Sequence, residues 1–419
     1  MKLFKNNIKL AIGAISFFIF LILMVIFVMI KIVLKPQKTL LYLDESPMTN
    51  KFASTFIKEV NKQNQDENNY LISPYSVGIA LNMLYSGANG TTKSEIENVI
   101  NPKLNITKND KIKIANAAFI KNKYKKYIDK EFSNKLERTF NSEILYDSYE
   151  TPDKINSWIN DKTDGMIPRL VEEINPEFVL GLANAIAIDA TWQNQFECNN
   201  TTKEEFTLND NTKLDAEMMH QQYTSSVKFY DKKDKGIKIP YKEGMDFIAI
   251  MPEDGINDYI KNLSSSALDD ILGGFQEATE KDKVNLSIPR FKYEYDLKTF
   301  KEVLKEIGIK DVFSLEKADL TGIISRDKLN EANIENLYVS KAIHKASINF
   351  NETGTKASAA TYFEISKENV MAESDKNTIH EIKFNRPFVY IIRESVSHDI
   401  LFFGVVYSPN KWNGSTCTE

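Results

Sequence analysis

One long apolar stretch near the N-terminus separates a possible membrane-spanning segment from the rest of the chain. The 21 residues from Leu10 to Ile30 carry no charge, and lysines lie before and after them. Such a stretch is long enough to span a bilayer as a helix, and it is longer than the apolar part of a usual cleaved signal peptide. We therefore expect a transmembrane signal-anchor at residues 10–30, after a basic segment at residues 1–9.

The residues after the anchor have the composition of one large folded domain. Hydrophobic residues make up 42% of the chain and charged residues 26%, which is typical of a globular protein. No linker rich in Pro, Gly or Ser interrupts this part of the chain. We expect a short linker at residues 31–47 and then a single domain at residues 48–419.

Charge and cysteine content exclude several classes of protein. The formal net charge is −5 and the positive charges are scattered, so the chain lacks the basic stripe that nucleic-acid binding needs. The two cysteines, Cys198 and Cys417, do not have the spacing of a metal site. Two free thiols are the favoured interpretation, and a disulfide bridge between them stays open for a domain outside the cell.

Common catalytic motifs are missing from the sequence. It has no GxSxG, HExxH, GxxxxGK[ST], GxGxxG or CxxC pattern,. Ser397, His398 and Asp399 are adjacent, and adjacent residues cannot adopt the geometry of a catalytic triad, so we interpret them as a turn between two strands. The four histidines do not have metal-ligand spacing. We expect neither an enzyme, nor a metal site, nor a cofactor.

Hydrophobic periodicity predicts helices and strands mixed along the domain, without a regular βαβ rhythm. Thr92 and Glu95 have the spacing of a capping box at the start of a helix. The predicted helices lie around residues 52–60, 79–84, 155–159 and 297–307, and the predicted strands lie at 182–188, 247–251, 284–288 and 401–407.

The segment from Asn69 to Thr92 resembles a signature of the serpin family, N-x-x-x-SPxSxxxALxMLxxGAxGxT. Further matches follow in the order that the family has, and together they cover about residues 48–410. They are Asn184 to Phe196, Pro252, Ile288 to Phe291, Lys341 to Ala346, Phe384 to Phe388, Leu401 to Gly404, and Pro409.

This resemblance implies an α+β serpin fold of three β-sheets with about eight or nine helices and an exposed reactive centre loop at about residues 352–383. It implies a metastable monomer that acts as a suicide inhibitor of serine-type endopeptidases, with cysteine proteases as a further target class. In that family a protease cleaves the loop, and the cut end inserts into the main sheet while the protease is still acylated. The alternative function is a non-inhibitory serpin that acts as a carrier or chaperone, which would be expected to have bulky, charged or Pro residues in the loop hinge.

The loop hinge has small residues instead. As a strand, the segment after Gly354 would place one row of small and then larger apolar side chains on one face and a mostly polar row on the other. No proline occurs from Thr355 to Lys367, so every residue there can donate its N–H within a central strand. The hinge residues that match the family are Glu352, Gly354, Thr355, Ala357, Ser358, Ala359, Ala360 and Thr361.

The family's spacing from the hinge places the scissile bond between Glu368 and Asn369, which points to a Glu-preferring protease. The stretch from Asn369 to Phe384 is several residues longer than usual in the family. Lys367, which suits a trypsin-like enzyme, and Met371, which suits a chymotrypsin-like or subtilisin-like enzyme, therefore stay open as alternatives.

Two further groups of residues match family sites under the main sheet. Ser73, Ser76, Asn184 and His344 match the shutter, where polar side chains hold the central strands of the sheet until the loop enters. Buried polar groups of this kind are tolerated only when they hydrogen-bond one another. Trp192 matches the tryptophan of the breach, where insertion begins.

The partners follow from these expectations. We expect a covalent acyl-enzyme complex with a target serine protease and attachment to a membrane through the N-terminal helix. The predicted location is the cell membrane, single-pass with the serpin domain outside the cell, or the secreted state if the N-terminal segment is cleaved.

Overall fold

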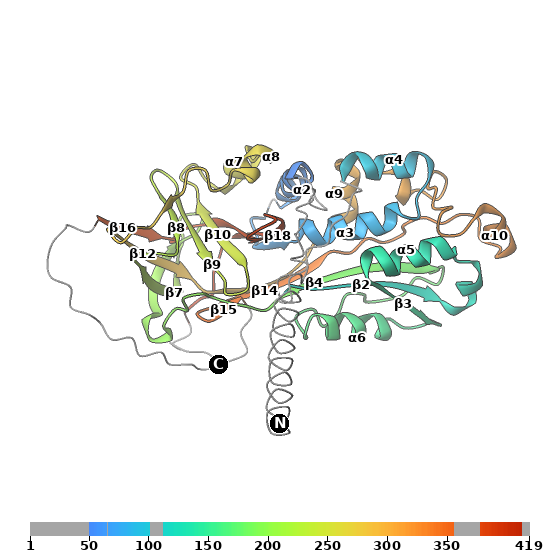
Figure 1. Ribbon diagram of the computed structural model, residues 1–419, viewed down its shortest axis with the longest axis horizontal. Coiled ribbons are helices and arrows are strands. Elements are labelled where there is room, and N and C mark those ends of the chain that lie inside the picture. The colour runs from blue at the N-terminus through green and yellow to red at the C-terminus, as the bar shows by residue number, and fades with distance from the viewer. Residues whose placement is uncertain (1–49, 65, 101–111, 356–377, 413–419) are drawn as a thin grey trace, which may run out of the picture. The chain divides into compact units, whose positions relative to one another are not determined.

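The computed structural model describes residues 50–64, 66–100, 112–355 and 378–412 (Figure 1). These residues belong to one compact unit, Glu45–Glu419. The α-helices within these ranges are α2 (Asn50–Gln63), α3 (Pro74–Tyr85), α4 (Gly90–Val99), α5 (Lys130–Phe140), α6 (Asp153–Lys162), α7 (Ile256–Lys261), α8 (Ser265–Asp269), α9 (Phe300–Glu306) and α10 (Arg326–Glu331).

The described strands form four hydrogen-bonded sheets. A seven-stranded sheet has the order β1 (Tyr70–Ile72), β18 (Ile400–Val406), β17 (Phe388–Glu394), β10 (Met245–Met251), β9 (Lys235–Pro240), β8 (Lys228–Asp231) and β11 (Gln276–Glu277). A four-stranded sheet has the order β16 (Thr378–Lys383), β12 (Asp282–Pro289), β7 (Lys213–Tyr223) and β6 (Thr202–Thr207). The other four-stranded sheet has the order β13 (Phe291–Asp296), β14 (Lys345–Phe350), β15 (Gly354–Thr355) and β5 (Ala190–Thr191), and the three-stranded sheet has the order β3 (Ser142–Asp147), β2 (Ile112–Lys121) and β4 (Leu180–Ile188).

The last two sheets account for the difference from the three sheets that the resemblance implies. Strand β4 ends at Ile188 and β5 begins at Ala190, so the chain passes from one sheet to the other across Asp189. Strand β5 then pairs with β15, and β15 pairs with β14. The chain itself therefore connects the two sheets at this end, and the described strands of one sheet make no ladder with those of the other.

Helices cover both faces of the three-stranded sheet. Helix α6 packs on one face through Ile155, Trp158 and Ile159, which form a separate hydrophobic cluster with Phe119 of β2. The rings of Phe119 and Trp158 meet edge to face at 5.4 Å. Helices α3 and α5 contact β4 and β3 and contribute instead to the main core, and Figure 1 shows them on the side of the sheet opposite to α6.

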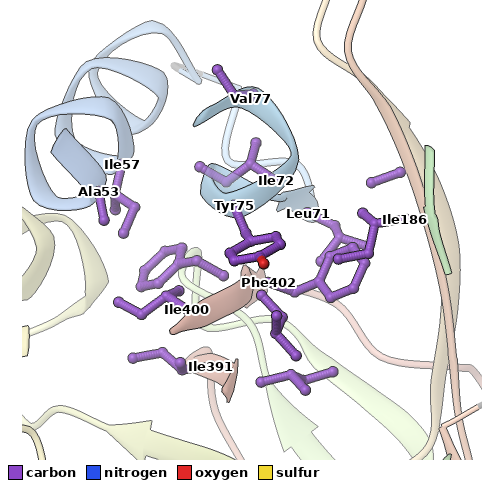
Figure 2. Packing of buried hydrophobic residues seen from close by; sticks show 14 of the residues in the cluster. Ala53, Ile57, Leu71, Ile72, Tyr75, Val77, Ile186, Ile391, Ile400 and Phe402 are labelled. Carbon is purple, nitrogen blue, oxygen red and sulfur yellow. The ribbon is translucent and has the colours of Figure 1, made fainter. Parts of the chain in front are cut away.

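The main hydrophobic core lies where α2 and α3 pack against the seven-stranded sheet. Residues of α3 are buried on nearly every side, which is the pattern of a helix enclosed by a core. Figure 2 shows Tyr75 of α3 amid this cluster, with Ile57 of α2 and with Ile400 and Phe402 of β18 nearby. Strands β10, β17 and β18 are buried along their whole length, so both faces of the sheet centre are covered.

The predicted helices and strands are confirmed, and one local detail is wrong. Helix α4 begins at Gly90, with Asn89 as its N-cap, so Thr92 and Glu95 do not form a capping box. Thr92 instead accepts the backbone N–H of Asp319 at 2.9 Å, and Glu95 accepts those of Lys310 and Asp311 at 2.7 Å each. Both side chains are used in contacts with distant segments, which local spacing cannot show. The predicted turn at Ser397 to Asp399 lies between β17 and β18.

The expected membrane anchor at residues 10–30 lies outside the described residues. Among the helices of residues 50–64, 66–100, 112–355 and 378–412, none has the length and apolarity to cross a membrane.

Candidate functional site

The candidate site is a strand position between β4 and β14. One edge of β4 pairs with β2, and one edge of β14 pairs with β13. On the other edge, β14 meets β15 through one residue pair, and the next strand in that order is β5, which continues β4. Among the described strands, the position between β4 and β14 is therefore filled only by the two residues of β15. Those two residues are the first part of the predicted loop.

The start of the loop is held tightly at this end of the sheet. The N–H of Trp192 donates to the carbonyl of Thr353 at 3.0 Å, and the N–H of Phe196 donates to the carbonyl of Glu352 at 3.0 Å. A Cβ on Gly354 would clash with the carbonyl oxygen of Ala190, so only glycine permits the backbone of the loop to approach β5 this closely.

Thr355 fixes the direction in which the loop side chains alternate. Its side chain is 3% exposed, and its Oγ1 lies 2.5 Å from the hydroxyl of Tyr241. Since successive side chains of a strand point to opposite faces, a strand continuing from Thr355 would direct Ala357, Ala359 and Thr361 to the same inner face. Residues 357–361 themselves lie outside the described residues.

Glu352 forms a buried ion pair with Arg290, which follows β12. The Nε of Arg290 donates to both carboxylate oxygens of Glu352, at 2.7 and 2.8 Å. Arg290 is 3% exposed and Glu352 is 6% exposed. Thr201 also donates a hydrogen bond to Glu352, and Arg290 Nη1 lies 3.7 Å from Glu217. This charged contact fixes the first residue of the hinge.

Trp192 lies directly beneath the start of the loop. Its ring is fully buried and stacks on Tyr241 at 4.3 Å, with Phe350 of β14 at 5.2 Å. The indole N–H donates to the carbonyl of Asn351 at 2.9 Å. The predicted breach residue therefore touches β14 and the backbone just before the hinge.

The four predicted shutter residues come together at the N-terminus of α3. The N–H of Ser73 donates to Nε2 of His344 at 3.1 Å, next to the start of β14. Ser73 also caps α3 by accepting the N–H of Ser76 at 3.1 Å, and its hydroxyl donates to the carbonyl of Leu401 at 2.6 Å. Ser76 donates to the side chain of Asn184 on β4. One helix end is thus bonded to β4 and to the residue that precedes β14, on the two sides of the candidate strand position.

Asn116 belongs to the same network, although the sequence did not single it out. Asn116 of β2 is the register partner of Asn184 and accepts its amide at 2.7 Å. Its own amide donates to the carbonyl of Phe140 at 2.6 Å. The available signal was a lone asparagine inside the apolar run Ile114 to Ile120.

His344 is held in its neutral form by its surroundings. Burial lowers the pKa of His344 to about 4, against an ordinary value of 6.5, and the carboxylate of Asp296 opposes this shift. A neutral Nε2 is required here because it accepts the N–H of Ser73,.

Several predicted site residues cannot be placed. Glu368, Asn369, Lys367 and Met371 lie outside the described residues. In the part of the chain that the structure covers, no group of three His, Cys, Asp or Glu side chains is arranged to hold a metal ion.

Cys198 corrects the interpretation of the cysteines. It is disulfide-bonded, so the favoured interpretation as a free thiol is wrong for this residue. Whether two cysteines far apart in the sequence pair depends on the tertiary fold, which their spacing does not show. Cys417 lies outside the described residues.

We expect the Glu352→Gln substitution to destabilise the protein strongly. Removing one partner leaves the buried charge of Arg290 without its main counterion, which costs about 3 kcal/mol or more. Urea unfolding followed by tryptophan fluorescence measures this loss. Glu294→Gln, at an exposed glutamate of β13, is the matched control and should leave the midpoint unchanged. Equal midpoints for the two variants would contradict the prediction.

We expect acid to weaken the shutter through His344. The unfolded chain binds a proton on this ring below about pH 6.5, whereas the folded protein resists it down to about pH 4. The free energy of unfolding is therefore unaffected by this ring above pH 6.5 and falls as the pH drops toward 4. The loss amounts to about 2 kcal/mol at about pH 5. The urea midpoint should therefore drop less on acidification in His344→Gln than in the parent. Equal drops in the two proteins would show that His344 is not the group responsible.

Comparison with known proteins agrees with this arrangement. Residues 47–409 match the serpin family, described as serine protease inhibitor. A serine protease inhibitor of Mus musculus is 27% identical over 85% of this chain and 87% of its own length, and leukocyte elastase inhibitor of Sus scrofa is 29% identical over 87% and 99%. Among solved structures, the thermophilic serpin tengpin in its native state is 27% identical, covers 86% of this chain and 94% of its own, and has a TM-score of 0.71. The chain therefore belongs to the serpin family, which is described as a family of inhibitors and not of enzymes, and it has the α+β serpin fold.

Proposed function

We propose that this serpin is a suicide-type inhibitor of serine-type endopeptidases. The observation that carries the proposal is the strand position between β4 and β14, which the described strands fill only with the two residues that begin the loop. Relatives named as a serine protease inhibitor and as a leukocyte elastase inhibitor support the same activity.

The proposed reaction starts at the loop. The serine hydroxyl of the protease attacks the carbonyl of the residue before the scissile bond, which the sequence places at Glu368. An ester forms between the two proteins, and the amine of the following residue leaves with the C-terminal part of the serpin. The cut end is then attached to the fold at its hinge alone, so it can move into the open strand position and carry the acylated protease with it.

The edges of β4 and β14 supply the driving force for insertion. Strand β4 is nine residues long, and a strand entering beside it can make ladder hydrogen bonds to both neighbours. Each such bond contributes about 1 kcal/mol net. Small side chains on the inner face, continuing from buried Thr355, allow the strand to enter between α3 and α6, whose side chains already pack against this layer.

We expect a complex that survives boiling in SDS when the protein is mixed with a protease that accepts its loop. Trypsin, subtilisin and a Glu-specific endopeptidase test Lys367, Met371 and Glu368 as the residue before the cut, and mass spectrometry of the released fragment places the bond. Ala357→Arg should convert the inhibitor into a substrate, since a charged side chain on the inner face blocks insertion. Ser358→Arg, on the outer face, is the matched control and should still form the complex.

Cleavage by all three enzymes without a covalent complex, and without a rise in thermal stability, would contradict the inhibitory function. The carrier or chaperone alternative would then take its place.

We also propose that residues 10–30 hold the protein in the cell membrane with the serpin domain outside the cell. The support is the uncharged run itself. We expect the full chain to stay in the membrane fraction after an alkaline carbonate wash. Replacing Leu21 and Met24 with lysine, at about 3 kcal/mol each near a helix centre, should release it, whereas Gln37→Lys outside the run should not. A soluble parent protein would contradict the anchor.

A further inference from the structure

Strand β16 is the attachment of the loop at its C-terminal end, as β15 is at its N-terminal end. It is the first described element after residue 377, and it lies at the edge of its sheet, in parallel pairing with β12. Among the described strands, β12 is the sole ladder partner of β16. An edge strand with one neighbour depends on side-chain contacts for much of its attachment.

His380 makes the polar contacts on the inner face of β16. Its Nδ1 lies 3.2 Å from an oxygen of Asp231 at the end of β8, and its Nε2 lies 3.1 Å from an oxygen of Asp282 at the start of β12. The ring also packs on Phe229 at 4.4 Å. All three polar side chains are about four-fifths buried, with exposures of 17% for His380, 21% for Asp231 and 20% for Asp282. The histidine therefore joins β16 to a neighbouring sheet as well as to its own.

The chemistry of this bridge requires a protonated ring. Ionised carboxylates only accept hydrogen bonds, and a neutral imidazole has one N–H to donate. A neutral His380 can therefore satisfy Asp231 or Asp282, and its other nitrogen then faces a carboxylate with lone pair against lone pair. The imidazolium form donates to both and neutralises one negative charge, and charge-assisted hydrogen bonds of this kind are the stronger ones.

The other charged side chains around His380 do not remove the need for its ring to be protonated. Lys235 of β9 pairs with Asp231, which leaves the group of two carboxylates and one lysine with a net negative charge that a protonated His380 cancels. Lys238 of β9 pairs instead with Asp246 of β10. On β8, Lys228 lies at the opposite end from Asp231 and, by strand alternation, on the other face,. On β12, Lys283 likewise points to the face opposite Asp282.

The pKa values of both carboxyls are lowered, as contact with hydrogen-bond donors predicts. Burial opposes the ionisation of Asp231, but hydrogen bonds from Lys235 and His380 lower its pKa overall. The pKa of Asp282 is lowered first by hydrogen bonds from Thr279 and then by His380. Both groups are therefore ionised acceptors at neutral pH.

We propose that His380 is a positioning residue whose protonated ring clasps β16 to β8 and β12 and thereby controls the release of the C-terminal end of the loop. This inference rests on the proposed function. An intact loop is tied both at β15 and at β16, so every residue that enters the position between β4 and β14 shortens the chain left to reach β16. A held β16 opposes insertion of the intact loop, whereas it does not restrain a loop that has been cut.

One consequence follows for the intact protein. While the contacts of His380 with Asp231 and Asp282 hold β16, the intact loop is opposed in inserting. When these contacts are removed, β16 detaches more often, and the intact loop can insert without a protease, which removes the inhibitor from use.

The test compares hydrogen–deuterium exchange of β16 in the full-length parent and in His380→Gln. Peptides covering residues 378–383 should exchange about tenfold faster in the variant, because glutamine cannot replace two charge-assisted hydrogen bonds. The intrinsic chemistry of exchange at one pH is the same for the unchanged residues of both proteins, so the ratio isolates the clasp. His398→Asn, in the turn between β17 and β18, is the matched control and should follow the parent.

A ratio near one would overturn the proposal. If His380→Gln does not fold, Asp282→Asn replaces it. This variant removes one of the two carboxylates that the ring contacts, so the same peptides should exchange faster than in the parent, and exchange at the rate of the parent would overturn the clasp.

A second readout separates this inference from the proposed function. Stored samples of both proteins are tested over time for the SDS-stable complex. His380→Gln should lose the ability to form it several times faster than the parent. Faster exchange of β16 in the variant with no complex from any fresh sample leaves the clasp standing and refutes the inhibitory function. A complex that decays equally in both proteins overturns the control of loop release.

Discussion

The strand position between β4 and β14 is the constraint on which the rest of this structure depends. Strand edges carry backbone N–H and C=O groups that require hydrogen-bond partners, and proteins normally pair or cover these edges. In the described part of this fold, the position is filled only where Gly354 and Thr355 enter it. The fold holds the two strands through side chains beneath the sheet: Ser73 and Ser76, at one helix end, reach His344 beside β14 and Asn184 on β4. These polar contacts act at single points, and each depends on the position of the N-terminus of α3.

The loop is attached at its two ends by different chemistry. At the N-terminal end, Arg290 and Glu352 form an ion pair that is almost completely buried. At the C-terminal end, His380 lies between two carboxylates, and all three side chains keep about a fifth of their surface exposed. A buried ion pair suits the end that must stay attached during insertion. A more exposed contact is tolerable at the other end, which a protease disconnects from the inserting strand.

The sequence was informative where the physics is local. Alternation and helical periodicity located β4, β10, β12, β18 and the helices around them. The central strand that the lack of proline after Thr355 allows stays a prediction, since it lies outside the described residues. The shutter and breach residues came from resemblance to a family, since their partners are far apart in the chain. The contacts that sequence reasoning missed are of the same kind: Arg290 and Glu352 are 62 residues apart, and Asn116 and Asn184 are 68 residues apart. Neither charge nor spacing indicates such pairs before the strand register is known.

Two histidines act at different places on the path that the intact loop would take into the sheet. His344, which burial keeps neutral, accepts the N–H of Ser73 and so supports the start of β14 from beneath. His380 contacts Asp231 and Asp282 and so holds the far end of the loop to two sheets. Spontaneous insertion requires both an opened sheet and a released β16. The two contacts therefore oppose it independently, and losing one of them leaves the other in place.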